Sequence, residues 1–508
     1  MQDSDGRSPS DGLLLESAND AALLELLRPR GYVRPTPHAK YDLVVIGGGT
    51  AGLVSAIGGA VLGARVALVE RRLLGGDCLN FGCVPSKALL RAARATHEPR
   101  DARALGIAMR ELEVDFPAVM ERMRAARATV APHDALAQVA SFGVHVFLGV
   151  ARFSAEDALD VDGTKLRFRR AIIASGGKPA VPAIPGLSEA GFLTNETVFS
   201  LTALPRRLAV LGGGPVGCEL AQAFRRLGAE VTLLQRAERL LPRDDPDAGR
   251  VLGAALESEA IRVLLRAHVK RVESEGASKV LIAEHDGNRH RIVVDAILVA
   301  TGRAPNLADL GLEAARVERD EHGVVVDDRL RSTNRRVYAA GDVCSTSKFT
   351  HAADALARVA LQNALFFTRK RASGLVIPWC TYTDPEVAHV GLGAADAAKR
   401  PGSATYTLEF AELDRAIIDG ERIGFARVHV DRKGRLLGAT LVGQHAAEMI
   451  GAAVLAIGSR APLRQLGSAI VPYPSRSEVW KRLADEHART RLTRSAHRWL
   501  QLFFRATR

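Results

Sequence analysis

The sequence predicts an α/β protein of three domains, and its length together with two similar strand–glycine–helix segments supports this prediction. The chain has 508 residues, which suggests three domains at about 150 residues each. An apolar strand at residues 41–46 runs into the glycine-rich segment 47–52, and another at 207–211 runs into the glycine-rich segment 212–217. A strand, a glycine-rich turn and a helix in this order are typical of a Rossmann-like nucleotide-binding domain.

The glycines of these two segments are expected to form two dinucleotide sites. Glycine lets the backbone approach a pyrophosphate closely, and the N-terminus of the following helix provides the field that holds its negative charge. The expected site residues are Gly47, Gly49 and Gly52 in the first segment and Gly212, Gly214 and Gly217 in the second.

The residue that ends the second strand of each domain indicates which nucleotide binds there. In the first domain this residue is Glu70, and a carboxylate suits the free hydroxyls of an adenosine ribose. In the second domain Gln235 takes that place and Arg236 follows it. A neutral residue beside an arginine favours a 2′-phosphate, so this domain is expected to prefer NADPH. If Arg236 is an ordinary surface arginine, the domain accepts NADH as well.

Two cysteines five positions apart, Cys78 and Cys83, follow the first nucleotide segment. Five helical residues rise about 7.5 Å, whereas the Cα atoms of a disulfide lie within about 7 Å, so this pair needs a bent or unwound turn. Gly82 provides the backbone freedom, and Pro85 is tolerated at a helix start. A pair near a helix N-terminus has a lowered thiolate pKa, which favours a redox-active dithiol over a structural disulfide. A metal site is not expected, since no second cysteine pair is nearby.

The whole chain has the features of a cytoplasmic protein. It contains no run of 18 apolar residues, and its first residues have neither the charged nor the apolar region of a signal peptide. Five cysteines in a chain of this length fit a reducing compartment. No basic motif of a nucleic-acid module is present, so no nucleic-acid partner is expected.

The basic charge of the chain is concentrated at its end. The formal net charge is +12, and residues 487–508 contain six arginines, no acidic residue and several large apolar residues, among them Trp499 and Phe503. Such a tail can make weak contact with an anionic membrane surface. The alternative that we favour from the sequence is a terminal helix docked on its own protein with a solvated basic face.

Three further motifs complete a family pattern. They are Ala-Thr-Gly-Arg-Ala-Pro-Asn at 300–306, Val-Tyr-Ala-Ala-Gly-Asp at 337–342 and Tyr-Thr-Asp-Pro-Glu at 382–386. With the dithiol and both glycine segments, the chain from about Tyr41 to about Glu486 resembles the class I pyridine nucleotide–disulfide oxidoreductases, which include lipoamide dehydrogenase, glutathione reductase and mercuric reductase.

The resemblance implies two Rossmann-like FAD- and NAD(P)-binding domains, with FAD in the first, and a C-terminal α+β domain that forms a homodimer. The implied domains are an N-terminal extension and linker at 1–40, the FAD-binding domain at 41–190 and 301–370, the NAD(P)-binding domain at 191–300, the dimerisation domain at 371–486 and the basic amphipathic tail at 487–508.

The resemblance also implies roles for residues near the flavin. Asp342 would hold the ribityl chain, Gly302 would belong to the FAD site, and Lys87 would lie near the flavin N5 and pair with Glu219. A cation at that place stabilises a reduced, anionic flavin.

The two cysteines have different implied roles. Cys83 would be the thiolate nearer the flavin, and Cys78 the sulfur that meets the substrate. Cys344 and Cys380 are expected to be core or interface residues, and His351 to have a capping or packing role.

One motif departs from the dithiol–disulfide members of the family. These carry His-Pro-Thr-x-x-Glu near the C-terminus, and the matching segment here runs from Tyr473 to Glu478 with tyrosine in place of the histidine. A phenol with a pKa near 10 is a poor base at neutral pH, whereas histidine near 6.5 suits the proton transfers of thiol exchange. Turnover of lipoamide or glutathione disulfide is therefore not expected.

Mercuric reductases also have tyrosine at this position, and a soft metal ion bound by thiolates does not need that proton shuttle. They also carry a C-terminal cysteine pair, however, and no cysteine follows Cys380 in this sequence. The prediction is thus a mercuric reductase-like NAD(P)H oxidoreductase with a small-molecule or metal-ion electron acceptor. The alternatives are lipoamide dehydrogenase-type or quinone reductase activity, and a redox sensor or membrane-surface binding protein without fast turnover.

Overall fold

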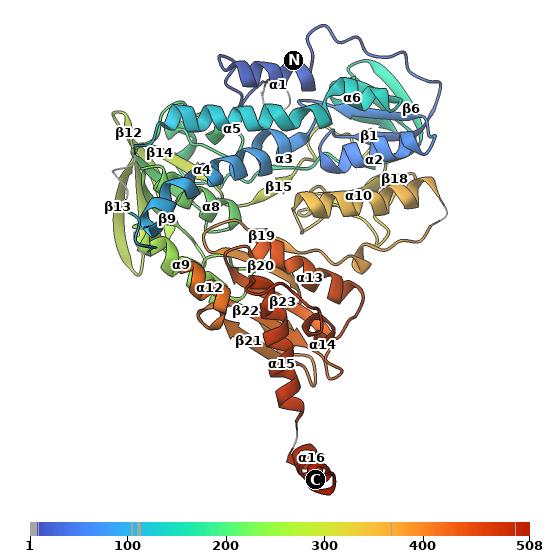
Figure 1. The fold of residues 1–508 in the computed structure, drawn as a ribbon. Helices are drawn as coiled ribbons and strands as arrows, with labels where there is room; N and C mark the ends of the chain where they lie inside the picture. The colour runs from blue at the N-terminus through green and yellow to red at the C-terminus, as the bar shows by residue number, and fades with distance from the viewer. Residues whose placement is uncertain (1–7, 9, 103–104, 109–112, 367, 493) are drawn as a thin grey trace. The chain divides into compact units, whose positions relative to one another are not determined.

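The computed structural model describes residues 8, 10–102, 105–108, 113–366, 368–492 and 494–508 (Figure 1). Its contacts divide the chain into two compact units. The first comprises Met1–Arg236 with Glu259–Leu375, and the second comprises Ala237–Ser258 with Val376–Arg508. The mixed α/β arrangement is the one predicted. The boundaries predicted for the FAD-binding, NAD(P)-binding and dimerisation domains stay a prediction, because the contacts divide the chain into two units only.

A mostly parallel sheet forms the centre of the first unit, with strand order β3-β2-β1-β6-β5-β4 and β18 paired with β6. In β1, residues 43–46 are apolar and buried, which is typical of a central parallel strand. Its Val45 lies opposite Leu68 of β2 and Ile172 of β6. The strands are β1 (Tyr41–Ile46), β2 (Val66–Glu70), β3 (Val144–Leu148), β4 (Ala151–Ala155), β5 (Ala158–Val161), β6 (Thr164–Ile173) and β18 (Val337–Ala339).

Helices cover this sheet, and α2 and α10 lie side by side (Figure 1). An apolar core that includes Ala56, Leu68 and Leu356 fills the space between these helices and the strands. The helices of this part are α1 (Ala18–Leu27), α2 (Thr50–Val61), α3 (Gly76–Phe81), α4 (Cys83–Ala102), α5 (Phe116–Val130), α6 (Leu136–Ser141) and α10 (Thr350–Leu365).

The N-terminal extension contributes to the core of the first unit. Helix α1 begins after Ser17, whose side chain caps it, and its Leu23 and Leu27 are fully buried. Asp20 of α1 and Arg127 of α5 form an ion pair that is fully buried. The sequence suggested a short helix here but no role, and the structure shows that it packs against α5.

A second parallel sheet in the first unit has the order β10-β9-β8-β14. Its elements are β8 (Arg207–Leu211), α8 (Pro215–Arg226), β9 (Glu230–Leu234), β10 (Arg262–Leu264) and β14 (Ala296–Val299). Smaller antiparallel sheets accompany it, formed by β11 (His268–Glu275), β12 (Ser278–His285) and β13 (Asn288–Val294), by β7 (Gly177–Pro179) and β15 (Arg303–Pro305), and by β16 (Arg319–Asp320) and β17 (Gly323–Val324). The short helix α7 (Leu187–Ala190) packs on β11.

The second unit is built on a five-stranded antiparallel sheet of order β19-β20-β23-β22-β21. The strands are β19 (Trp379–Thr381), β20 (Glu386–Gly391), β21 (Ala404–Glu409), β22 (Phe425–Val430) and β23 (Leu436–Gly443). The helices are α9 (Pro246–Ser258), α11 (Ala394–Ala398), α12 (Asp414–Asp419), α13 (Ala446–Gly458), α14 (Leu463–Gly467), α15 (Val479–Arg491) and α16 (Arg494–Ala506). Among the residues described, no helix is both long and apolar enough to cross a bilayer.

Candidate active site

The two cysteines lie on either side of a break between helices. Helix α3 ends at Phe81 and α4 begins at Cys83, so Gly82 separates them. A Cβ on Gly82 would lie 2.9 Å from the carbonyl oxygen of Asp77 and 3.3 Å from the Cα of Cys78. Only a residue without a side chain fits this close approach. The unwound turn predicted from the spacing is therefore present, and it brings the two thiols into hydrogen-bonding contact.

The environment of Cys83 stabilises a thiolate. A hydrogen bond from Cys78 lowers the pKa of Cys83 to about 6, and Thr350 and the charge of Lys87 act in the same direction against the effect of burial. The Sγ of Cys83 lies 3.2 Å from Oγ1 of Thr350. The same hydrogen bond to Cys83 raises the pKa of Cys78, so Cys78 holds the shared proton. The pair can thus present one thiolate and one thiol at neutral pH.

Lys87 and Glu219 form an ion pair that joins α4 to α8. The Nζ of Lys87 lies 2.8 Å from Oε2 of Glu219, and the Glu219 side chain is only 5% exposed. Lys87 is one helical turn beyond Cys83, so its charge lies on the dithiol side of α4. The resemblance implied this contact, while the role of the pair in catalysis stays a prediction.

The first glycine segment forms a cradle that suits a pyrophosphate. Gly47 has φ +106°, and a Cβ there would lie 2.3 Å from the carbonyl oxygen of Ala174. A Cβ on Gly52 would lie 1.7 Å from the Gly47 carbonyl oxygen. Gly49 is the N-cap of α2, and no side chain caps this helix, so its first N–H groups suit an anion.

Glu70 ends β2 beside this cradle. Its Oε2 accepts a hydrogen bond from the Gly48 N–H at 2.6 Å, and its Oε1 accepts one from the Arg72 N–H at 2.6 Å. A carboxylate has further lone pairs, so these bonds leave capacity for ribose hydroxyls. The residues present therefore fit the adenosine and pyrophosphate of FAD.

The second glycine segment repeats this geometry. Gly212 has φ +108°, a Cβ on Gly217 would lie 1.8 Å from the Gly212 carbonyl oxygen, and Gly214 is the N-cap of α8. The Oε1 of Gln235 accepts a hydrogen bond from the Gly213 N–H at 3.3 Å, as Glu70 does from Gly48. Arg236 follows β9 with an exposed side chain. This segment fits a dinucleotide as well.

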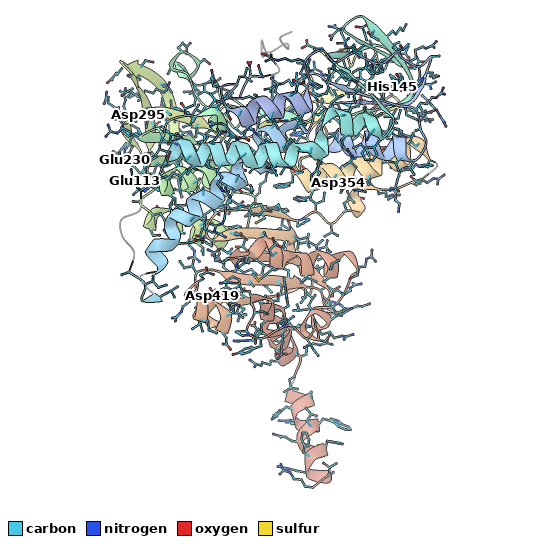
Figure 2. The ribbon with its side chains drawn as sticks, turned by 45° about the horizontal axis from the view of Figure 1, so that its top comes forward. Glu113, His145, Glu230, Asp295, Asp354 and Asp419 are labelled. Carbon is cyan, nitrogen blue, oxygen red and sulfur yellow. The ribbon has the colours of Figure 1, made fainter. Side chains whose placement is uncertain are left out.

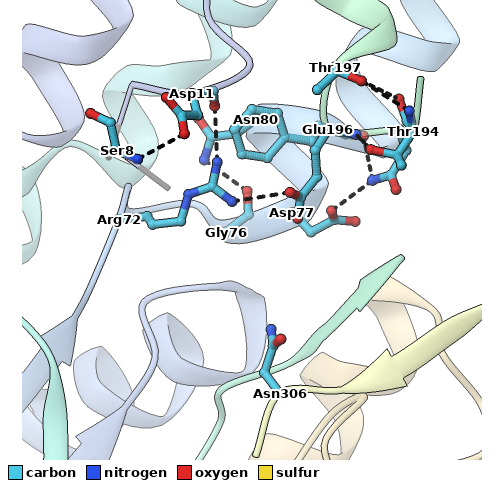
Figure 3. Close-up of polar contacts among 12 residues, drawn as sticks. Ser8, Asp11, Arg72, Gly76, Asp77, Asn80, Thr194, Glu196, Thr197 and Asn306 are labelled. Atoms are coloured by element: carbon cyan, nitrogen blue, oxygen red, sulfur yellow. Dashed lines mark hydrogen bonds and ion pairs between the residues drawn. The ribbon is translucent and has the colours of Figure 1, made fainter. Parts of the chain in front are cut away.

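Asp342, which the resemblance implied, belongs to a charged group with Arg303 and Asp77, and the sequence did not indicate these two residues. Arg303 lies between two carboxylates: its Nε is 3.1 Å from Asp342 Oδ2 and its Nη1 is 3.2 Å from Asp77 Oδ2. Asp77 also accepts a hydrogen bond from Asn195 Nδ2 at 3.0 Å (Figure 3). Burial raises the pKa of Asp77, and Arg303 opposes this shift. Gly302, directly before Arg303, has φ +126° and is exposed, with no atom close enough to meet a Cβ.

A second ion pair lies next to this group. Arg72 pairs with Glu196 at 3.4 Å, and its Nη2 donates to the carbonyl oxygen of Asp11 at 3.0 Å (Figure 3).

Three residues beside the dithiol were not predicted from the sequence: Asp77, Arg303 and Thr350. The position of Asp77 before Cys78 and of Arg303 after Gly302 are the available sequence signals, whereas Thr350 had none.

Tyr473 and Glu478 lie in the second unit. The Tyr473 hydroxyl donates a hydrogen bond to Asp414 Oδ2 at 2.9 Å, which raises the pKa of the phenol. Its side chain is 70% exposed. Glu478 is half-buried, and its Oε2 has no hydrogen-bond partner among the described residues. Arg476 fixes the segment between them by an ion pair with Asp419 at 3.0 Å. Asp419 is labelled in Figure 2.

The other three cysteines have surroundings that do not favour thiol exchange. Cys218 is buried in α8, and burial raises the pKa of Cys344 to about 12. Cys380 is half-buried in β19. These positions suit packing roles.

Comparisons with known proteins agree over most of the chain. Residues 41–358 match the family model of the pyridine nucleotide-disulphide oxidoreductases, and residues 377–484 match the model of their dimerisation domain. The chain is 34% identical to a mercuric reductase of Bacillus cereus over 87% of this chain and 70% of the relative. It is 36% identical to a dihydrolipoyl dehydrogenase of Thermus scotoductus over 86% of this chain and 95% of that relative.

Solved structures show the same fold. The HOCl-induced flavoprotein disulfide reductase RclA from Escherichia coli superimposes with a TM-score of 0.79 at 29% identity, over 88% of this chain and 99% of that one. A Cu(II) complex of the same protein superimposes with a TM-score of 0.78 at 28% identity, over 87% of this chain and 99% of that one.

Proposed function

The chain belongs to the pyridine nucleotide-disulphide oxidoreductase family, whose enzymes depend on FAD and use NAD(P)H, and we propose that Cys78 and Cys83 are its redox-active pair. The class of enzyme predicted from the sequence is thereby confirmed. The observation that carries the proposal for the pair is the break at Gly82, which places Cys78 and Cys83 at adjoining helix ends, with Thr350 Oγ1 3.2 Å from the Cys83 sulfur. A surface or structural cysteine pair has no need of such a stabilised thiolate.

The chain's own residues would hold the cofactor and move the proton. The cradle of Gly47 and Gly52, with Glu70, would hold the adenosine and pyrophosphate of FAD, and Asp342 the ribityl chain. When bound there, FAD would supply the redox chemistry that connects NAD(P)H to the disulfide. The disulfide takes up two electrons and one proton, its S–S bond breaks, and the proton goes to Cys78 while Cys83 remains a thiolate.

We propose a soft metal ion as the electron acceptor. The thiol of Cys78 and the thiolate of Cys83 release two electrons and one proton as their disulfide re-forms. Both electrons go to one divalent ion, or one electron goes to each of two ions. Thiolates are the preferred ligands of such ions. Relatives named mercuric reductase and the Cu(II) complex of the E. coli protein support this choice of acceptor.

Tyr473 supports the same choice. Its phenol donates to Asp414 and has a raised pKa, so it is a poor base for the thiol exchange that an organic disulfide requires. The dihydrolipoyl dehydrogenase relative favours lipoamide as the second candidate. Quinone reduction and a sensor without fast turnover are the remaining alternatives predicted from the sequence.

An acceptor panel tests these alternatives. NADPH oxidation would be followed with Hg(II), Cu(II), lipoamide, glutathione disulfide and a soluble quinone, for the wild type and for Cys78→Ser. We expect a metal ion to be turned over at least about tenfold faster than lipoamide, and this activity to be lost in Cys78→Ser. Equal lipoamide turnover would overturn the metal-ion proposal while leaving the redox pair intact. Full metal-ion turnover in Cys78→Ser would overturn the role of the pair.

We further propose that NADPH is the preferred nucleotide, that two chains form the working enzyme, and that it acts in the cytoplasm. Exposed Arg236 beside neutral Gln235 supports the first point. The match of residues 377–484 to a dimerisation domain supports the second. The low number of cysteines, five in 508 residues, supports the third. Contact of the tail with a membrane surface is proposed as a separate property of residues 487–508.

A further inference from the structure

Helix α16 (Arg494–Ala506) has an apolar face and a basic face. At 3.6 residues per turn, Trp499, Phe503 and Ala506 follow one another along one side of the helix. Arg498 and Arg505 lie two turns apart on the opposite side. The apolar and the basic side chains therefore lie on different sides of the helix, and the apolar ones form a continuous stripe.

The apolar face of α16 is exposed. Trp499 is 75% exposed and Phe503 53%, and the other large apolar side chains of the helix are exposed as well: Leu500, Leu502 and Phe504. Contiguous exposed side chains of this size mark an interaction surface. A terminal helix docked on its own chain, which the sequence favoured, would bury these side chains. Within the described part of the chain, these side chains are exposed and not docked.

The preceding helix provides a fixed base for α16. In α15 (Val479–Arg491) the side chains of Val479, Trp480 and Leu483 are buried in the core of the second unit. His487 contacts the hydroxyl of Tyr406 at 3.1 Å through its Nδ1. The chain is therefore anchored up to about Arg491, and α16 is a separate element beyond this anchor.

Charge indicates what covers the apolar face. Residues 487–508 contain six arginines and no acidic residue. The matching tail of a second copy would carry the same positive charge and be repelled, whereas an anionic lipid surface attracts it. Each arginine near such a surface contributes about a fivefold increase in binding constant. Tryptophan and phenylalanine on the opposite face suit the boundary between headgroups and acyl chains.

We propose that α16 binds an anionic membrane surface, lying in the plane of the interface with its apolar face toward the acyl chains. The binding is peripheral and reversible, because one short amphipathic helix buries only a few side chains in the lipid. It is weakened by salt, since the arginines contribute through electrostatic attraction. No residue of α16 belongs to the dithiol or nucleotide sites, so the redox reaction does not require the contact.

Vesicle sedimentation of the full-length, FAD-loaded protein tests this proposal. Vesicles of phosphatidylcholine with about one third phosphatidylglycerol would be compared with pure phosphatidylcholine vesicles, at low and at high salt. We expect binding to the anionic vesicles only, decreasing with salt. The double variant Trp499→Ser, Phe503→Ser should bind at least about tenfold more weakly. Arg498→Gln, Arg505→Gln should bind more weakly at low salt and lose about a third of the salt dependence, because four of the six arginines remain.

A matched control separates this surface from general hydrophobicity. Val61 and Leu62, at the end of α2, are exposed to a similar degree, and their replacement by serine should leave vesicle binding unchanged. NADPH-driven flavin reduction reports whether each variant is folded. Wild type that stays in solution, or a Trp499→Ser, Phe503→Ser variant that sediments like wild type, would overturn the proposal. So would a change in oligomeric mass of that variant without lipid, because α16 would then be a protein–protein contact.

Discussion

The Sγ of Cys83 lies 3.2 Å from Oγ1 of Thr350, although 267 positions separate the two residues in the chain. Cys83 begins α4 and Thr350 begins α10, so two helix N-termini meet at one sulfur atom. The partial positive charge of a helix N-terminus stabilises a nearby anion. The thiolate is therefore held from two sides, by Thr350 and by the hydrogen bond from Cys78.

Replacement of Thr350 by valine should raise the pKa of Cys83 by about one, because a hydrogen bond to a charged group is lost. The pKa of Cys83 is lowered to about 6, so its thiolate is present above that pH and is lost as the pH falls through it. In Thr350→Val this loss should occur at higher pH. The pH dependence of alkylation of the reduced protein by iodoacetamide measures this shift. Thr350→Ser keeps the hydroxyl and should behave like wild type. An unchanged profile in Thr350→Val would contradict this account.

Replacement of Asp77 by asparagine should act in the opposite direction. The Asp77 carboxylate raises the pKa of Cys83, so its removal should let the thiolate persist to lower pH. The long-wavelength thiolate–flavin absorbance of the reduced holoenzyme, titrated with acid, reports this pKa. Asp354→Asn is the control, because Asp354 lies further along α10 and pairs with Arg358 (Figure 2). If Asp77→Asn and wild type titrate alike, Arg303 already neutralises the Asp77 charge.

The Lys87–Glu219 pair can be tested with a double-mutant cycle. Lys87→Met, Glu219→Gln and the double variant would be compared in urea unfolding and in the rate of flavin reduction. We expect a coupling free energy of about 1–2 kcal/mol, because Glu219 is nearly buried while Lys87 is partly solvated. Flavin reduction should slow about tenfold or more in Lys87→Met. Additive effects on stability would show that the ion pair contributes little.

Replacement of Arg236 by alanine should weaken the use of NADPH and leave that of NADH nearly unchanged. A charged hydrogen bond to a 2′-phosphate contributes about tenfold in kcat/KM. Arg239→Ala, three residues further along, serves as the control for a general loss of positive charge. Steady-state kinetics with both nucleotides measures the effect. Equal losses for the two nucleotides would remove Arg236 as the discriminating residue.

Replacement of Tyr473 by histidine should introduce the base that thiol exchange lacks. General acid–base catalysis is worth about 10²-fold or more. We expect measurable lipoamide turnover in Tyr473→His and none in Tyr473→Phe, with the same flavin reduction in both. Lipoamide reduction coupled to NADPH oxidation is the assay. If Tyr473→His remains inactive while its flavin is reduced normally, the missing base is not what limits this acceptor.

Local features of the site could be predicted from the sequence because each depends on residues that are neighbours in the chain. The approach of Gly52 to Gly47, that of Gly217 to Gly212 and the break at Gly82 are of this kind, since close backbone approach excludes a side chain. The Lys87–Glu219 contact is not local, and only the resemblance to a family implied it.

Contacts between distant segments could not be predicted. Arg303 reaches Asp77 and Asp342 from a different strand, and no periodicity or spacing relates these three positions. The burial of Asp20 against Arg127 is similar: each looks like a surface charge in its own helix until the helices pack together. Such pairs follow from the tertiary arrangement, which pattern analysis of single segments does not contain.

The second glycine cradle shows how a binding preference can change without a change in shape. Gln235 is uncharged, yet its Oε1 accepts a hydrogen bond from the Gly213 N–H, as Glu70 accepts one from the Gly48 N–H in the first cradle. An amide at 3.3 Å and a carboxylate at 2.6 Å thus both support the loop, and they differ in a single heavy atom. A carboxylate and an amide at this place therefore keep the hydrogen bond to the loop, while only the carboxylate presents a negative charge that would oppose a 2′-phosphate.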